Sequence, residues 1–129
     1  MTQIVWLLEE TVRAIQQRQI AEHGGSPGVR DEALLLSALA RPLSLLAYRE
    51  HGLDLAALAA SYAFGITRNH PFVDGNKRTA LVSAQTFLLL NGVSLQATQE
   101  EKYLTFIKLA EGSLSEDQLA EWIRQHSSR

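Results

Sequence analysis

At 129 residues, with 46% hydrophobic and 20% charged side chains, the chain has the size and composition of one globular domain over residues 1–129. A formal net charge of −2 without any basic block argues against direct nucleic-acid binding. The absence of cysteine excludes disulfides and thiolate metal sites and fits a cytoplasmic protein. No apolar run approaches the roughly 18 residues of a membrane span, and an N-terminus with Glu9 and Glu10 does not resemble a signal peptide.

The first half of the chain has a hydrophobic period of about 3.6 residues, which predicts helices rather than strands. A first helix is expected over residues 3–22, and the glycine- and proline-rich stretch 24–28 ends it. A second helix is expected over residues 31–40, with its first residue as the N-cap and Pro42 as its end. Residues 43–52 are less regular, and we expect a short extended or hairpin-like segment there.

Two further helices flank a short polar loop in the middle of the chain. Asp54 is the expected N-cap of a helix that runs close to Asn69. Pro71 ends this helix, because the residue before a proline is pushed out of the α region. The next helix is expected over residues 76–90, followed by an Asn-Gly stop at residues 91–92. Between Leu81 and Leu90 its side chains are apolar in nearly every direction, so we predict that it is central and buried.

The last part of the chain contains two capping-box patterns, which mark helix starts. Thr98 is followed by Glu101, and Ser115 is followed by Gln118. The sequence therefore predicts an all-α fold, a compact single-domain bundle of about six helices. No repeat, low-complexity segment or interdomain linker interrupts it.

Residues 70–78 (His-Pro-Phe-Val-Asp-Gly-Asn-Lys-Arg) carry most of the chemistry of the chain. The start of a buried helix offers free backbone N–H groups and a partial positive charge, and Gly75 allows a phosphate to approach them closely. Asn76 adds side-chain donors, and Lys77 and Arg78 add two cations. Cations at a helix N-terminus oppose the helix dipole at a cost of up to about 1 kcal/mol, which a bound polyphosphate removes. This conflict indicates an anion site.

Two more residues of this stretch fit a reaction at a phosphate. Asp74 supplies the single carboxylate that suits Mg²⁺, which takes its other ligands from water and phosphate oxygens. His70 has an ordinary pKa of about 6.5 and is a candidate to accept a proton from a hydroxyl group. Phe72 is expected to anchor the loop in the core. A lone histidine at a helix end or an Asp-Gly-Asn turn is weak evidence by itself. Together these residues predict transfer of a phosphorus-centred group to a hydroxyl.

The stretch 70–79 (His-Pro-Phe-Val-Asp-Gly-Asn-Lys-Arg-Thr) resembles the signature of the Fic/Doc superfamily, and specifically of its Doc (death-on-curing) branch. Residues 24–31 (Gly-Gly-Ser-Pro-Gly-Val-Arg-Asp), 37–42 (Ser-Ala-Leu-Ala-Arg-Pro) and 87–92 (Phe-Leu-Leu-Leu-Asn-Gly) are also similar to those of small Doc-like proteins. The resemblance covers nearly the whole chain, and the length agrees.

The resemblance implies a Fic-type helical fold and a transferase that depends on ATP and Mg²⁺. Doc-like toxins transfer the γ-phosphate to a threonine of translation elongation factor Tu, which arrests translation. By this analogy His70 is the general base and Asp74 holds Mg²⁺. The phosphates would bind Asn76, Lys77, Arg78 and the backbone around Gly75. Residues 43–52 would form the flap that docks the target, and a separate antitoxin protein would bind the toxin.

Two departures from the AMP-transferring Fic proteins favour phosphoryl transfer. Those proteins have a glycine where this chain has Lys77, and an arginine where it has Leu81. The lysine adds bulk and charge beside the phosphates, and the missing arginine removes a phosphate clamp. The chain also lacks the Ser/Thr with a Glu four residues later that marks self-inhibited Fic proteins. Inhibition is therefore expected from another protein.

Two other readings stay open from the sequence. One is a Fic-type protein AMP transferase, which uses the same loop but transfers the α-phosphorus with its nucleoside. The other is a catalytically silent module that binds a partner with this loop. The presence of His70, Asp74 and Asn76 argues against the silent module, because a decayed site tends to lose its base or its metal ligand.

Overall fold

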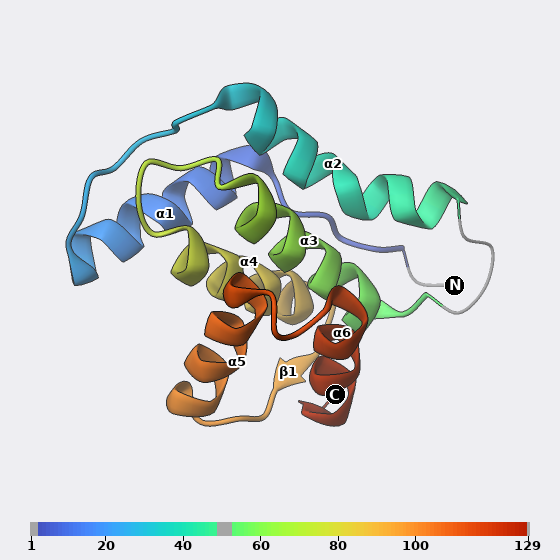
Figure 1. The fold of residues 1–129 in the computed structure, drawn as a ribbon. Coiled ribbons are helices and arrows are strands. Elements are labelled where there is room, and N and C mark those ends of the chain that lie inside the picture. The colour runs from blue at the N-terminus through green and yellow to red at the C-terminus, as the bar shows by residue number, and fades with distance from the viewer. Residues whose placement is uncertain (1–2, 49–52, 129) are drawn as a thin grey trace.

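Helices α3 (Leu55–Asn69) and α4 (Asn76–Leu90) lie at the centre of the molecule (Figure 1). The computed structural model describes residues 3–48 and 53–128. The inner face of α3 consists of small and apolar residues, so the neighbouring helices approach it closely. Its buried residues are Ala56, Leu58, Ala59, Ala60, Ser61, Tyr62, Ala63, Gly65 and Ile66. Together α3 and α4 position the polar loop that joins them.

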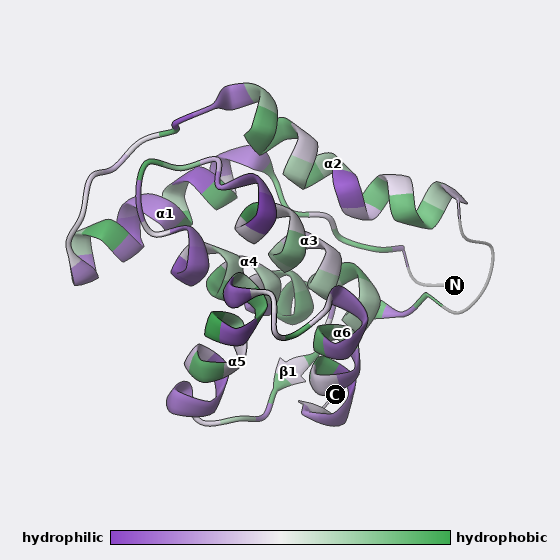
Figure 2. Cartoon of the chain, in the orientation of Figure 1, coloured by the Kyte–Doolittle hydropathy of each residue, from purple (hydrophilic) through white to green (hydrophobic). Residues whose placement is uncertain are grey.

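Four further helices pack around this central pair. Helices α1 (Glu9–His23) and α5 (Gln99–Glu111) pack against α4, whereas α2 (Glu32–Tyr48) and α6 (Glu116–Gln125) pack against α3. Hydrophilic residues gather on α1, α5 and α6 (Figure 2). No helix in the described residues has both the length and the hydropathy to cross a bilayer. The predicted all-α bundle of about six helices is confirmed.

The interface between α2 and α3 explains why Pro42 does not end α2. The prediction of a helix end there is wrong, because α2 continues to Tyr48 with the proline buried in its interior. A Cβ atom built on Gly65 of α3 would lie 3.2 Å from the carbonyl oxygen of Ala38, the residue four positions before the proline. Proline removes one helical hydrogen bond. The apolar burial of Leu35, Ala38 and Pro42 outweighs this loss.

The segment before α1 is extended, so the prediction of a helix over residues 3–22 is wrong at its start. The side chain of Asn91 accepts a hydrogen bond from Val5 N (2.8 Å) and donates one to Val5 O (2.9 Å). The backbone N–H of Leu7 donates to the hydroxyl of Tyr62 (3.2 Å). These side chains satisfy the backbone N–H and C=O groups of the segment without a helix. Helix α1 therefore begins only at Glu9.

The expected extended or hairpin-like flap over residues 43–52 is wrong for residues 43–48, which belong to α2. Residues 49–52 lie outside the described residues. The only strand pair among the described residues forms elsewhere. Strands β1 (Ser94–Leu95) and β2 (Ser127–Ser128) pair antiparallel and attach the end of the chain to the turn after α4.

The remaining helix boundaries follow the predicted signals. Asp54 caps α3 by accepting from Ala57 N (2.9 Å), and α4 covers residues 76–90 as predicted. Both predicted capping boxes are present, with Thr98 at the start of α5 and Ser115 at the start of α6. Local capping chemistry therefore determines the starts of α3, α5 and α6.

Candidate functional site

The loop between α3 and α4, residues 70–75, is called the motif loop from here on. It begins at His70, which has φ 51° and ψ 54° and donates its N–H to Ile66 O (3.1 Å). This left-handed conformation costs a residue with a side chain about 1–2 kcal/mol. The loop ends at Gly75, with φ 76°, where no Cβ opposes the same conformation. Phe72 is 1% exposed, which confirms the predicted core anchor.

The side chain of Asn76 closes the motif loop from within. It accepts a hydrogen bond from Phe72 N and donates one to Phe72 O, each at 3.0 Å. The residue is only 4% exposed. The side-chain donor that the sequence analysis assigned to a phosphate is thus engaged with the loop backbone in this structure. The phosphate-binding role of Asn76 remains a prediction.

A second loop, residues 24–31, packs along the motif loop and is called the glycine loop below. Val29 and Phe72 form an antiparallel β-bridge, and the N–H of Val73 donates to Gly28 O (3.1 Å). A Cβ atom built on Gly25 would lie 3.2 Å from the Cβ of Asp74. The sequence analysis treated this stretch only as a helix stop and a family likeness, and so missed its structural role.

Asp74 is held on two sides. Its carboxylate Oδ2 accepts a hydrogen bond from Ser26 N (2.8 Å) in the glycine loop. Its backbone carbonyl accepts from the Nε2 of Gln16 (3.1 Å), a side chain of α1 that is 1% exposed. No sequence signal distinguished Gln16 from the other glutamines of α1. Only the tertiary structure reveals its contact with the motif loop.

The predicted site residues come together around one hollow of about 220 Å³, called the motif hollow. Its lining consists of His70, Asp74, Gly75, Asn76, Lys77, Arg78 and Tyr103. All six residues singled out from the sequence are present, and Tyr103 of α5 is the addition. A Cβ on Gly75 would lie 3.2 Å from Cδ1 of Ile20, so the loop packs tightly against α1 at this point.

The start of α4 is electrostatically unusual. No side chain caps it, and its first turn contains Lys77 and Arg78 but no acidic residue. Within residues 3–48 and 53–128 neither cation forms a salt bridge. Uncapped N–H groups and two cations therefore lie together at the motif hollow. This arrangement favours the binding of an anion.

A second hollow of similar size, the side hollow, adjoins the motif hollow. Its lining consists of Gln19, His23, Arg78, Leu81, Val82, Gln99 and Tyr103. The two hollows share Arg78 and Tyr103, and the guanidinium carbon of Arg78 lies 5.3 Å from the centre of the Tyr103 ring. The side hollow thus combines an aromatic ring and aliphatic side chains next to the motif hollow.

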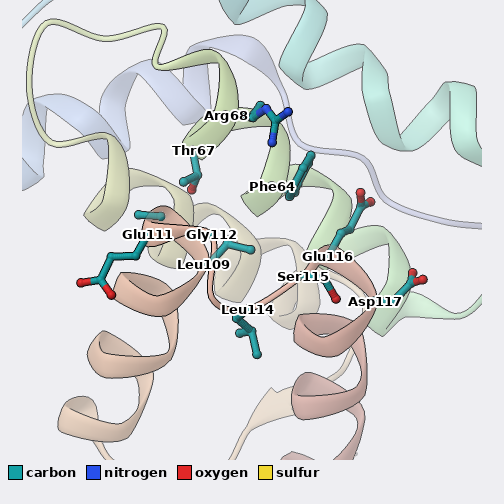
Figure 3. Close-up of a pocket in the computed structure, with 11 residues that line it drawn as sticks. Phe64, Thr67, Arg68, Leu109, Glu111, Gly112, Leu114, Ser115, Glu116 and Asp117 are labelled. Atoms are coloured by element: carbon teal, nitrogen blue, oxygen red, sulfur yellow. The ribbon is translucent and has the colours of Figure 1, made fainter.

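A larger hollow of about 600 Å³ lies between α3, the end of α5 and the start of α6 (Figure 3). It shares no residue with the motif hollow. Arg68 supplies its one cation, packed against Phe64, whereas Glu111, Glu116 and Asp117 contribute carboxylates. An excess of carboxylates repels phosphate, so size alone does not make this hollow the nucleotide site.

Comparison with known proteins agrees with this geometry. The sequence profile of the Fic/DOC family matches residues 6–88. Protein kinase doc of Escherichia phage P1 is 35% identical over 116 residues, which is 90% of either chain. Toxin Doc of Mycolicibacterium smegmatis is 46% identical over 78 residues, 57% of either chain. Protein adenylyltransferase Fic of Drosophila melanogaster is 39% identical over 88 residues, 65% of this chain but 17% of that protein. The chain belongs to the Fic/DOC family, in its Doc branch.

Proposed function

We propose that this protein is a Doc-type protein kinase that transfers the terminal phosphoryl group of ATP to a Ser or Thr hydroxyl of a protein target. The observation that carries the proposal is the motif hollow. It gathers a histidine, a carboxylate, two cations and an uncapped helix start around a volume of about 220 Å³. The names of the Doc relatives support a kinase and a toxin.

The residues present fit a magnesium–nucleotide complex. No cluster of three or more His, Asp or Glu side chains able to hold a metal occurs in the described part of the chain. Magnesium bound to a nucleotide needs only one or two protein carboxylates, because phosphate and water complete its shell. Asp74 is the carboxylate at the motif hollow. The first turn of α4, with Lys77 and Arg78, would bind the phosphates.

In the proposed reaction the hydroxyl oxygen of the target attacks the γ-phosphorus. The new O–P bond forms as the bond from that phosphorus to the bridging oxygen breaks, and ADP leaves. The imidazole of His70 accepts the proton of the hydroxyl. Lys77, Arg78 and the N–H groups of α4 stabilise the negative charge on the transferred phosphoryl group and on ADP. The bound magnesium would supply further charge neutralisation.

The side hollow supports phosphoryl rather than AMP transfer. Val82 lies six residues beyond Asn76, or about 9 Å along α4 at 1.5 Å per residue. A nucleoside in the side hollow would place its phosphates along Arg78, with the terminal phosphorus farthest from the base and nearest His70. Leu81, where AMP-transferring relatives have an arginine, lines this hollow and is 9% exposed. An apolar wall suits a base better than a phosphate.

For the biological role, we propose a toxin that acts in the cytoplasm on translation elongation factor Tu and is held inactive by a separate antitoxin. The family resemblance and the name Toxin Doc support this role. Helix α2 supports a protein partner, because Leu36, Leu43 and Leu46 are 51%, 45% and 37% exposed. Exposed apolar side chains on one helix are typical of protein-binding surfaces.

The test is transfer to purified elongation factor Tu with magnesium and ATP labelled at the γ- or the α-position. Intact-mass spectrometry should show one added phosphoryl group, and only the γ-label should reach the target. His70→Ala should reduce the rate by about 10²- to 10⁴-fold. Asp74→Ala should also remove activity, and both should abolish growth arrest. Asp117→Ala, which changes an exposed carboxylate of α6, is the matched control and should keep wild-type activity.

Transfer of the α-label would instead support AMP transfer, the activity in the name of the Drosophila relative. Binding of ATP without transfer to any protein would favour the silent binding module.

A further inference from the structure

Arg30 of the glycine loop contacts the backbone on which His70 is mounted. Its Nε donates to the carbonyl oxygen of His70 (2.8 Å), and its Nη2 donates to the carbonyl oxygen of Asn69 (3.0 Å). Both carbonyls belong to the C-terminal end of α3, where the helix dipole favours a cation. The planar guanidinium binds two acceptors at once, which a lysine side chain does not reproduce.

The backbone around Arg30 continues the same clamp. Arg30 N donates to Pro71 O (2.7 Å), and Asp31 N donates to the same oxygen (3.1 Å). Arg30 therefore donates to the carbonyl groups of Asn69, His70 and Pro71, and Asp31 donates to that of Pro71 as well. Among the described residues, the glycine loop holds these three consecutive carbonyls, whereas those of Phe72 and Asp74 accept from the side chains of Asn76 and Gln16.

The residue that these hydrogen bonds hold, His70, has an unfavourable backbone conformation. It is the only non-glycine residue in the described part of the chain with a positive φ. Such a conformation persists only where the surroundings fix it. Release of the His70 and Asn69 carbonyls would let the backbone relax toward an ordinary conformation and move the imidazole away from the motif hollow.

We infer that Arg30 is a positioning residue, which holds His70 in the left-handed conformation that presents its imidazole to the target hydroxyl. The kinetic part of this inference rests on the proposed function. Arg30 does not line the motif hollow, whose phosphate-binding part is formed by α4. Its loss should therefore affect the chemical step and leave nucleotide binding intact.

The kinetic test uses Arg30→Ala in the intact protein. We expect kcat to fall by about 10- to 100-fold, the range for a displaced catalytic group, with an unchanged KM and Kd for ATP. The kcat of Arg30→Lys should lie between those of the wild type and Arg30→Ala, because lysine keeps the charge but not the two-point contact. Arg18→Ala is the matched control, since Arg18 is an exposed arginine of α1 paired with Glu22. A folded Arg30→Ala protein with wild-type kcat would overturn the inference. So would a loss of ATP affinity that accounts for the whole loss of rate.

A structural test is independent of catalysis. The NOE between the amide proton and the Hα of His70 is strong only when φ is positive. We expect it to be strong in the wild-type protein, weaker in Arg30→Lys and weakest in Arg30→Ala. An undiminished NOE in Arg30→Ala would overturn the inference, even if the wild-type protein transferred nothing from ATP and the proposed function failed. If Arg30→Ala does not fold, the same comparison is made on Arg30→Lys, with the same meaning.

Discussion

The buried side chain of Gln16 donates a hydrogen bond to the backbone carbonyl of Asp74 over 3.1 Å, across 58 positions of sequence. The same amide group contacts Ser26 O (3.4 Å) and accepts from Gly28 N (3.3 Å). One side chain of α1 thus connects the motif loop with the glycine loop. The proposed magnesium ligand owes its position to two segments that precede it by more than 40 residues.

Replacing Gln16 with leucine should therefore destabilise the protein although leucine is apolar and of similar size. The change leaves the carbonyl of Asp74 and the N–H of Gly28 without their side-chain partner. Buried polar groups that lose a partner cost about 1–3 kcal/mol in the free energy of unfolding. Urea denaturation followed by circular dichroism measures the change. Gln17→Leu is the control, because its exposed side chain should change stability by no more than about 0.5 kcal/mol.

If both variants lost the same stability, the loss would come from the exchange of glutamine for leucine in α1 and not from the hydrogen bonds of Gln16. A folded Gln16→Leu protein should also need more magnesium for half-maximal activity, because Asp74 loses its backbone support. An unchanged magnesium requirement would mean that Gln16 stabilises the motif loop without determining the position of the Asp74 carboxylate.

The parts of this fold that sequence predicts are those with local causes. Asp54, Thr98 and Ser115 accept hydrogen bonds from backbone N–H groups within their own helices, so their neighbours in sequence suffice to identify the helix starts. The six predicted site residues likewise come from a single short stretch, which explains why they line one hollow; their roles stay predictions.

The wrong helix boundaries result from contacts between residues that are far apart in the sequence. The amphipathic pattern of residues 3–8 fits a helix, but Asn91 and Tyr62 bind their backbone and keep them extended. Pro42 is a helix breaker by local chemistry, and packing on α3 overrides this preference. The contacts of Gln16 and Arg30 depend on where two distant loops meet, which no local pattern encodes.

Tyr103 tests where the nucleoside binds. It is 40% exposed, stacks near Arg78 and lines both the motif hollow and the side hollow. Stacking of a base on an aromatic side chain contributes about 1–3 kcal/mol, so Tyr103→Ala should weaken ATP binding by roughly 5- to 150-fold. Tyr103→Phe keeps the ring and should bind nearly as well as the wild type. Isothermal titration calorimetry with ATP and magnesium measures the affinity.

Tyr48→Ala provides the matched control for this experiment. Tyr48 is 87% exposed at the end of α2, outside both hollows. Equal affinities for wild type, Tyr103→Ala and Tyr48→Ala would place the base outside the side hollow. The position of the base would then no longer favour phosphoryl over AMP transfer. The assignment of the motif hollow as the phosphate site would be unaffected.

Asp54 links α3 to α6 and should make stability depend on pH. Its carboxylate accepts hydrogen bonds from Arg124 (2.6 and 3.0 Å) and from Ala57 N (2.9 Å). The hydrogen bonds from Arg124, followed by that from Ala57 N, hold the pKa of Asp54 below its ordinary value. The folded state therefore binds the proton less readily than the unfolded state. This contribution to stability is complete above the ordinary pKa of about 3.9 and is lost as the pH falls through the lowered value.

Asp54→Asn isolates this contribution, because asparagine still caps α3 but carries no charge for Arg124. At neutral pH the variant should be less stable by at most about 1 kcal/mol, since both partners are about half-exposed. The difference should vanish in acid below the lowered pKa and shrink in high salt. Asp54→Ala should lose about 1 kcal/mol more at neutral pH, because it also removes the cap. Urea denaturation of all three proteins from pH 7 to pH 3 measures these differences. A gap between wild type and Asp54→Asn that stays constant over this range would mean that the Arg124 pair does not stabilise the fold.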